Sequence, residues 1–130
     1  MATRTALRPQ IVLDAGDMSG DLISDPTVLQ SLTMGSYAVS WSGTSPIGTL
    51  SLQVSDDYSL DPNGQVNNPG TWNTAPLSVG GTTSNTIPIT GNTGNGYIDI
   101  LGTGAYASRL IYTAASGTGS LTITVVGKVS

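Results

Sequence analysis

The sequence predicts an all-β protein, an antiparallel β-sandwich or jelly-roll-like domain that follows an extended N-terminal arm. Three observations support this fold class. Serine, threonine, glycine, asparagine and proline make up half of the 130 residues. Glutamate is absent and only four residues are basic, so long helices stabilised by charge pairs are not expected. Apolar and polar residues alternate in several segments, which is the pattern of a strand with one buried face.

Residues 1–35 are interpreted as an extended arm that packs on a neighbouring molecule or on its own domain. The short apolar run Ile11–Leu13 is compatible with a strand. Asp25 and Pro26 suit the cap and the first position of a helical turn over residues 27–32, and a strand there is the alternative. Residues 36–130 form the predicted β-sandwich domain.

The start of the arm carries the residues that we predict to bind a partner. Two arginines stand within the first eight residues, and four aspartates follow between positions 14 and 25. A short basic segment can contact an acidic partner surface, although an ordinary solvated terminus would have the same composition. The predicted partner-binding residues are Arg4, Arg8, Ile11, Val12 and Leu13.

Two pairs of alternating segments predict hairpins in the domain. Residues 36–42 and 49–55 alternate apolar and polar side chains, with the turn signal Ser45-Pro46 between them. Near the C-terminus, residues 109–113 and 120–125 are separated by a glycine-rich tetrapeptide. We expect each pair to form an antiparallel hairpin with one apolar face. Weaker strands are expected at residues 72–74, 77–79, 86–89 and 97–101.

The stretch from 56 to 70 is predicted to be a long loop. It contains Asp61-Pro62-Asn63-Gly64, in which proline fixes φ and Asn-Gly tolerates positive φ, so a turn is expected there. Two aromatic residues, Tyr58 and Trp72, flank most of this loop and could stack on a ligand such as a sugar. They are the predicted ligand-facing pair. Trp41, by contrast, lies on the apolar side of its strand and is expected in the core.

The residue types that are present argue against catalysis. Histidine and cysteine are absent, which excludes histidine-based triads, thiol nucleophiles and ordinary zinc sites. The aspartates lie mostly in loops that we expect to be exposed, which disfavours a pair of glycosidase carboxylates. A calcium site from Asp56, Asp57, Asp61 and Asn63 would not match an EF-hand spacing. We therefore expect no enzyme activity, no catalytic residues, no cofactor and no metal.

Charge and hydropathy narrow the possible partners. The net charge is −4, and the four basic residues are scattered, so nucleic-acid binding is not expected. The longest apolar runs have three residues, too few to cross a membrane. No signal peptide is visible after the first arginines, which indicates synthesis in the cytoplasm.

Two segments resemble a pattern found in small bacteriophage virion proteins with a β-sandwich fold. Residues 41–57 read W-S-G-T-S-P-I-G-T-L-S-L-Q-V-S-D-D, similar to a strand, a Ser-Pro-Gly turn and a second strand in that family. Residues 108–128 resemble its closing hairpin, in which an Arg-aliphatic-aliphatic-Tyr strand turns through Ser-Gly-x-Gly. The resemblance covers about residues 36–130. It departs from the family pattern where residues 56–70 displace the next tryptophan to position 72.

This resemblance implies a virion structural protein that decorates or cements the outer capsid surface. Its partners would be the major capsid protein and further copies of itself, and it would reside in the virion after synthesis in the host cytoplasm. The family offers no catalytic motif to carry over. The alternative is a tail or fibre component, or a receptor- or carbohydrate-binding β-sandwich module, which would present Tyr58 and Trp72 to its ligand. A secreted module and a small enzyme are less favoured.

Overall fold

A computed structural model of the chain describes residues 6–28, 34–79, 82–100 and 106–128. Within these ranges the regular elements are all β-strands and their pairings are all antiparallel, so the all-β, antiparallel part of the prediction is confirmed. The strands are β1 Ala6–Asp17, β2 Leu22–Ile23, β3 Thr27–Val28, β4 Met34–Ser55, β5 Ser59–Leu60, β6 Val66–Asn68, β7 Asn73–Ala75, β8 Leu77–Val79, β9 Thr82–Ser84, β10 Ile87–Ile89, β11 Thr93–Ile100 and β12 Ala107–Lys128.

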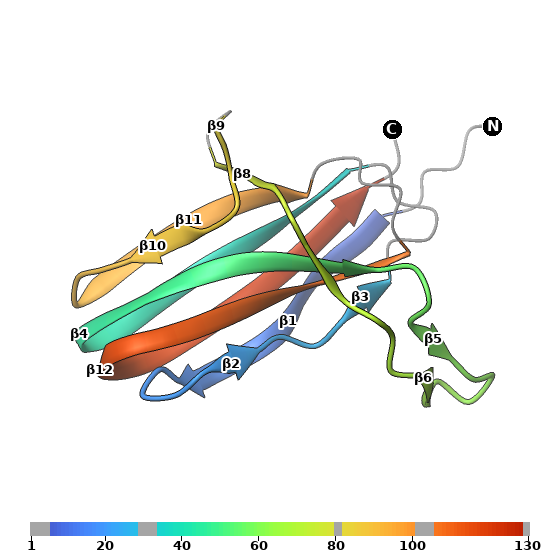
Figure 1. Ribbon diagram of the computed structural model, residues 1–130, viewed down its shortest axis with the longest axis horizontal. Coiled ribbons are helices and arrows are strands. Elements are labelled where there is room, and N and C mark those ends of the chain that lie inside the picture. The colour runs from blue at the N-terminus through green and yellow to red at the C-terminus, as the bar shows by residue number, and fades with distance from the viewer. Residues whose placement is uncertain (1–5, 29–33, 80–81, 101–105, 129–130) are drawn as a thin grey trace.

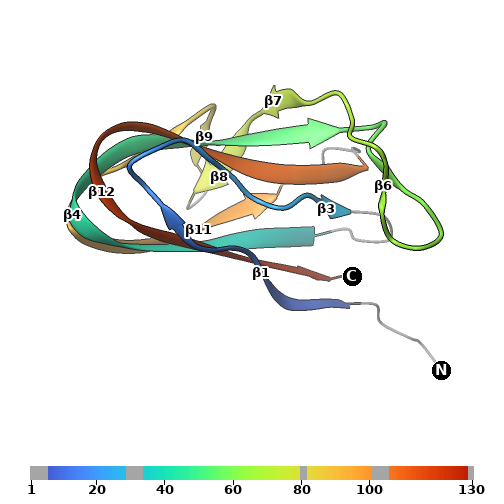
Figure 2. The same ribbon diagram turned by 90° about the horizontal axis from the view of Figure 1, so that it is seen from below.

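Two long strands, β4 and β12, run through the whole molecule. Each has 22 residues, and they pair along their entire length, from Ala107 opposite Ser55 to Lys128 opposite Met34. Figure 2 shows that both strands bend back at one end of the molecule, so their two halves lie in separate layers. One continuous hydrogen-bonded sheet therefore forms both layers.

The other strands extend these two layers sideways. In the first layer, β1 pairs with the second half of β12, and β11 pairs with the first half of β4. There, β8 and β9 continue the sheet beyond β11 (Figure 1). In the second layer, β2 and β3 pair with the first half of β12, while β7 and β10 pair with the second half of β4. The predicted loop 56–70 contains its own small sheet of β5 and β6.

The two predicted hairpins are wrong. Residues 36–42 pair with 120–126 of β12, and residues 49–55 pair with 107–113, so neither long strand folds onto itself. The turn signals instead mark the corner at which both strands pass from one layer to the other. Ser45 has φ +47° and Gly117 has φ +81°, and the register of β4 against β12 shifts on both sides of Ser116. These features are those of β-bulges, which bend a strand without reversing it.

The apolar side chains of the alternating segments fill the space between the layers. Fifteen buried residues form this core: Val12, Met18, Tyr37, Val39, Leu50, Leu52, Ala75, Leu77, Ile89, Ile98, Leu110, Tyr112, Leu121, Ile123 and Val125. Trp41 packs against them, as expected, and is half-buried. The next residues along each strand point away from the core, so each layer also has an outer face.

The described part of the predicted arm, residues 6–28, is paired with its own chain. β1 forms the edge of the first layer, with register shifts that interrupt its ladder with β12. Val12 and Met18 belong to the core, and the Ser24 amide donates to the Leu110 carbonyl at 3.0 Å. A helical turn or a strand was expected over residues 27–32. The structure has the strand β3 at its start, and residues 29–33 lie outside the described ranges.

Candidate docking surfaces

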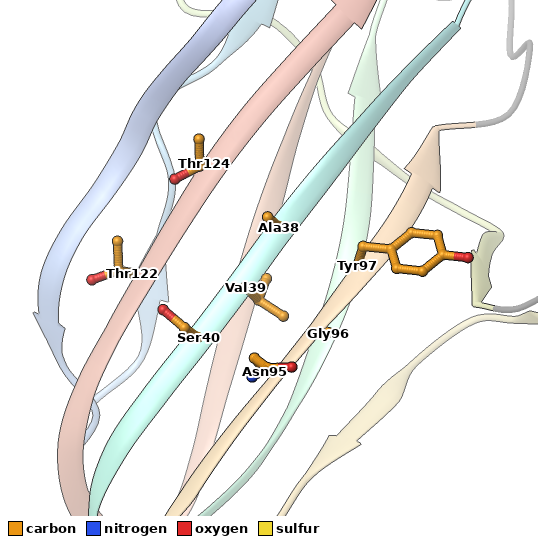
Figure 3. Close-up of a pocket in the computed structure, with 8 residues that line it drawn as sticks. All are labelled: Ala38, Val39, Ser40, Asn95, Gly96, Tyr97, Thr122 and Thr124. Carbon is orange, nitrogen blue, oxygen red and sulfur yellow. The ribbon is translucent and has the colours of Figure 1, made fainter.

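The outer face of the first layer carries a shallow groove with a volume of about 390 Å³. Its lining comes from three neighbouring strands, β12, β4 and β11, as Figure 3 shows. The lining residues are Ala38, Val39, Ser40, Asn95, Gly96, Tyr97, Thr122 and Thr124. We call this surface the groove face.

The register of the strands explains why these residues meet. Thr124 stands opposite Ala38, and Ala38 stands opposite Tyr97, so the three form one row across the sheet. On the other side of Thr124, β1 adds Ile11 to the same row. Since directly opposed residues share a face, the row runs from Ile11 to Tyr97 over a floor of small side chains.

The two ends of this row are large and exposed. Ile11 is 59% exposed and Tyr97 is 55% exposed, whereas the floor between them is made of alanine and threonine. The eight lining residues include no charged side chain. A surface of this kind can bind a partner by apolar contact at its ends and by hydroxyl hydrogen bonds between them.

A second cluster surrounds Trp72, beside the small sheet of β5 and β6. The Arg109 guanidinium carbon lies 4.2 Å from the centre of the Trp72 ring, which is a cation–π distance. The Tyr58 ring is 5.7 Å from Trp72 and tilted by 50°. The Trp72 indole N–H donates to the Pro69 carbonyl at 2.9 Å, which fixes the ring in this position.

Asp57 ties the loop to this cluster. One of its carboxylate oxygens accepts from the Thr71 amide at 2.6 Å and from the Ser55 hydroxyl at 2.8 Å. These hydrogen bonds, the one from Thr71 foremost, lower the pKa of Asp57. The Ser55 oxygen in turn accepts from the Tyr58 amide at 3.1 Å. The aromatic pair is therefore held by its own loop.

The structure distributes the predicted site residues over different environments. Tyr58 was expected to face a ligand, but it is only 7% exposed because its ring packs against Trp72. Trp72 is half-buried and one face of its ring lies under Arg109. The two aromatic rings are thus brought together, and their contacts are with each other and with Arg109.

The predicted partner-binding residues also differ in how far they are buried. Ile11 is exposed on the groove face, Val12 is buried, and Leu13 is half-buried against the core. Arg8 lies in β1, and Arg4 lies outside the described residues. Sequence reasoning missed Tyr97, although its alternation with the core residue Ile98 already places it on the outer face.

Buried polar groups are few in the described part of the chain. The Tyr37 hydroxyl is 2.7 Å from the Ser108 hydroxyl between the layers. Three buried polar atoms have no hydrogen-bond partner among the described residues: Thr27 Oγ1, Trp41 Nε1 and Tyr112 Oη. The described residues contain no group of three or more acidic side chains that could hold a metal. They also contain no helix with the length and hydropathy needed to cross a membrane.

The chain is a small antiparallel β-protein with a groove on the outer face of one layer, and the eight residues that line this groove carry no charge. No protein-family model matches the sequence, and a search of curated proteins finds no match. Among solved structures, the fold is similar to the crystal structure of SPBc2 prophage-derived protein YomS. The TM-score is 0.61 at 12% sequence identity, and the match covers 97% of this chain and 96% of that one. The chain therefore shares its fold with a prophage-derived protein.

Proposed function

We propose that this chain is a non-enzymatic structural protein of a bacteriophage virion that decorates and cements the outer capsid surface by bridging neighbouring capsid subunits. The observation that carries the proposal is the groove face, whose uncharged lining ends at the exposed Tyr97 on one side and adjoins the exposed Ile11 of β1 on the other. The fold shared with a prophage-derived protein supports a phage origin.

The groove face suits attachment to a broad surface. Its floor of small side chains lets another backbone approach closely, and its two exposed apolar residues can enter pockets of the partner. A contact confined to the uncharged residues that line the groove avoids the cost of removing charges from water. Cementing needs contact area and hydrogen bonds, and the side chains of Ser40, Thr122 and Thr124 supply hydroxyl groups for them.

Bridging raises the overall affinity even when each single contact is weak. A protein that touches two neighbouring subunits binds the second at a high effective concentration once the first contact has formed. Because it binds only the assembled shell, its binding free energy adds to the stability of that shell. Copies of this chain would then lie between subunits of the major capsid protein in the virion.

The alternative, a tail or fibre module for receptors or carbohydrates, would use Trp72 as its stacking surface. In the structure Arg109 covers one face of that ring and Tyr58 packs against it. This arrangement favours the capsid proposal. A glycan array remains the direct measurement for the alternative, since binding that is lost in Trp72→Ala would support it.

Co-sedimentation with capsid shells of the source phage, stripped of this protein, tests the proposal. Ala38→Glu places a charge on the floor of the groove face, where Ala38 is exposed, and is expected to weaken shell binding about tenfold or more. Gln65→Glu adds the same charge to the exposed turn between β5 and β6 and should bind as the wild type does. Equal binding of wild type and Ala38→Glu would overturn the assignment of the groove face. Failure of the wild type to bind would overturn the capsid proposal.

A further inference from the structure

Arg109 is held in one orientation on the outer face of the second layer. Its Nε donates to the Gln53 side-chain oxygen at 3.0 Å, and its guanidinium lies against the Trp72 ring. Gln53 stands directly opposite Arg109 in the pairing of β4 with β12. The plane and the direction of the guanidinium are therefore fixed before any partner arrives.

Most of the hydrogen-bonding capacity of Arg109 is unused within the described residues. A guanidinium has five N–H donors, and Gln53 takes the one on Nε. Partial burial alone lowers the pKa of Arg109, with no contribution from a nearby carboxylate. The group stays protonated at neutral pH. The remaining edge of the fork has the geometry that binds a carboxylate through two parallel hydrogen bonds.

The segment next to Arg109 supplies the complementary groups. β2 and β3 pair with β12 on either side of Arg109, at Ile111 and Ser108, so the connection between them runs beside it. That connection contains Asp25, which is exposed. Ile23 precedes it, is 55% exposed and stands opposite Ile111. A cation on β12, an apolar residue on β2 and an anion in the connection after β2 thus lie close to one another along this side of the sheet.

A surface with this composition is complementary to itself. In a two-fold contact the same patch is used by both molecules, so each cation can meet the anion of the other copy. We propose that the outer face of the second layer docks a second copy of this chain, with Arg109 of each copy binding Asp25 of the other and Ile23 packed between them. Two copies that each carry a net charge of −4 repel one another overall, so the contact depends on the local attraction between Arg109 of one copy and Asp25 of the other.

This contact is separate from the groove face, which lies on the opposite layer. The inference therefore goes beyond the capsid proposal and does not depend on it. A dimer joined in this way would turn its two groove faces outward, and each copy could engage a different capsid subunit.

Sedimentation velocity of the purified full chain, at a series of micromolar concentrations, tests the inference. The wild type is expected to form a dimer. Arg109→Asp and Asp25→Arg, each alone, should raise the dissociation constant about tenfold or more, because both place like charges in contact. The double variant restores opposite charges and should return to within about threefold of the wild type.

Two controls separate the contact from general effects of charge and folding. Asp14→Arg changes the charge as Asp25→Arg does, at an exposed position on β1, and should leave the dissociation constant unchanged. Asp25→Arg and Asp14→Arg should keep the thermal midpoint of the wild type within a few degrees, since both side chains are exposed. Arg109→Asp also loses its contacts with Gln53 and Trp72, so its midpoint is expected to fall while the unfolding transition stays cooperative. A monomeric wild type, or a double variant that stays as weak as the singles, would overturn the inference even if the shells are bound.

Discussion

The hydroxyl groups of Tyr37 and Ser108 lie 2.7 Å apart between the two layers. Tyr37 comes from the first half of β4 and Ser108 from the first half of β12, in opposite layers, and both residues are fully buried. The two side chains form a buried hydrogen bond that joins one layer to the other through the core. It fixes the alignment of one layer over the other, which apolar packing alone specifies less sharply.

Removing either partner of this hydrogen bond should destabilise the fold. Tyr37→Phe leaves the Ser108 hydroxyl buried without a partner, and Ser108→Ala does the same to Tyr37, so each should lower the free energy of unfolding by about 1–3 kcal/mol. The double variant should cost less than the sum of the two. Urea denaturation measures all three. Strict additivity would show that the two hydroxyls do not interact.

Alkaline pH should destabilise the fold through Tyr37. Burial raises the pKa of Tyr37, and the Ser108 hydrogen bond offsets part of that increase. The associated stability is fully present below the pKa of the unfolded chain, about 10. As the pH rises further, the unfolded chain loses this proton while the folded state retains it, so the free energy of unfolding falls.

This pH dependence can be measured by urea denaturation between about pH 8 and about pH 11. The decline should be smaller in Tyr37→Phe. Burial, together with the charge of Asp21, also raises the pKa of Tyr112. Tyr112→Phe should therefore remove a further part of the decline in the free energy of unfolding. A Tyr37→Phe profile that parallels the wild type over the whole range would exclude Tyr37 as a source of the decline.

Gly117 at the corner should tolerate substitution much less well than Gly64. A Cβ there would overlap the Ser45 carbonyl on the facing strand, and the residue also has φ +81°. Gly64 has a similar φ, +82°, but open space around it. Gly64→Ala should therefore cost about 1–2 kcal/mol and Gly117→Ala about 2–5 kcal/mol, as measured by denaturation. Equal costs would mean that the two strands do not approach closely at the corner.

Substitutions at two adjacent residues of β1 should affect different properties, one the stability of the fold and the other the binding to shells. Val12→Ala opens space in the core and should lower the free energy of unfolding by about 1–3 kcal/mol. Ile11→Ala, at an exposed position, should change it by less than about 0.5 kcal/mol while weakening shell binding. Denaturation and co-sedimentation measure the two effects. Retention of full shell binding by Ile11→Ala would remove Ile11 from the docking surface.

Local patterns predicted the strands well because alternation depends only on which face is buried. Tyr37, Leu52, Leu110 and Ile123 all point into the core as their segments indicate. The turn of Asp61–Gly64 also follows its residues: Gly64 has φ +82°, and Asp61 accepts from the Asn63 and Gln65 amides. Both features are decided within a few residues of the chain.

Long-range pairing could not be read from the same patterns. Glycine, serine and proline around Ser45 and Gly117 indicate a backbone that departs from an ideal strand, but a hairpin reversal and a bent corner need the same residues. Which of the two forms is decided by pairing between β4 and β12, more than 50 residues apart in the chain. For Tyr97, alternation with Ile98 already indicates an outward side chain, but only the register of β11 against β4 places it beside Ala38.

The copy number of this chain in purified phage particles tests the central claim most directly. Quantitative mass spectrometry gives the ratio of this chain to the major capsid subunit in the same sample. A capsid decoration protein that bridges neighbouring subunits is predicted to be present at a ratio set by the shell lattice, comparable to that of the subunit itself. A few copies per particle would place the chain in the tail or fibres, and its absence from particles would contradict a virion role.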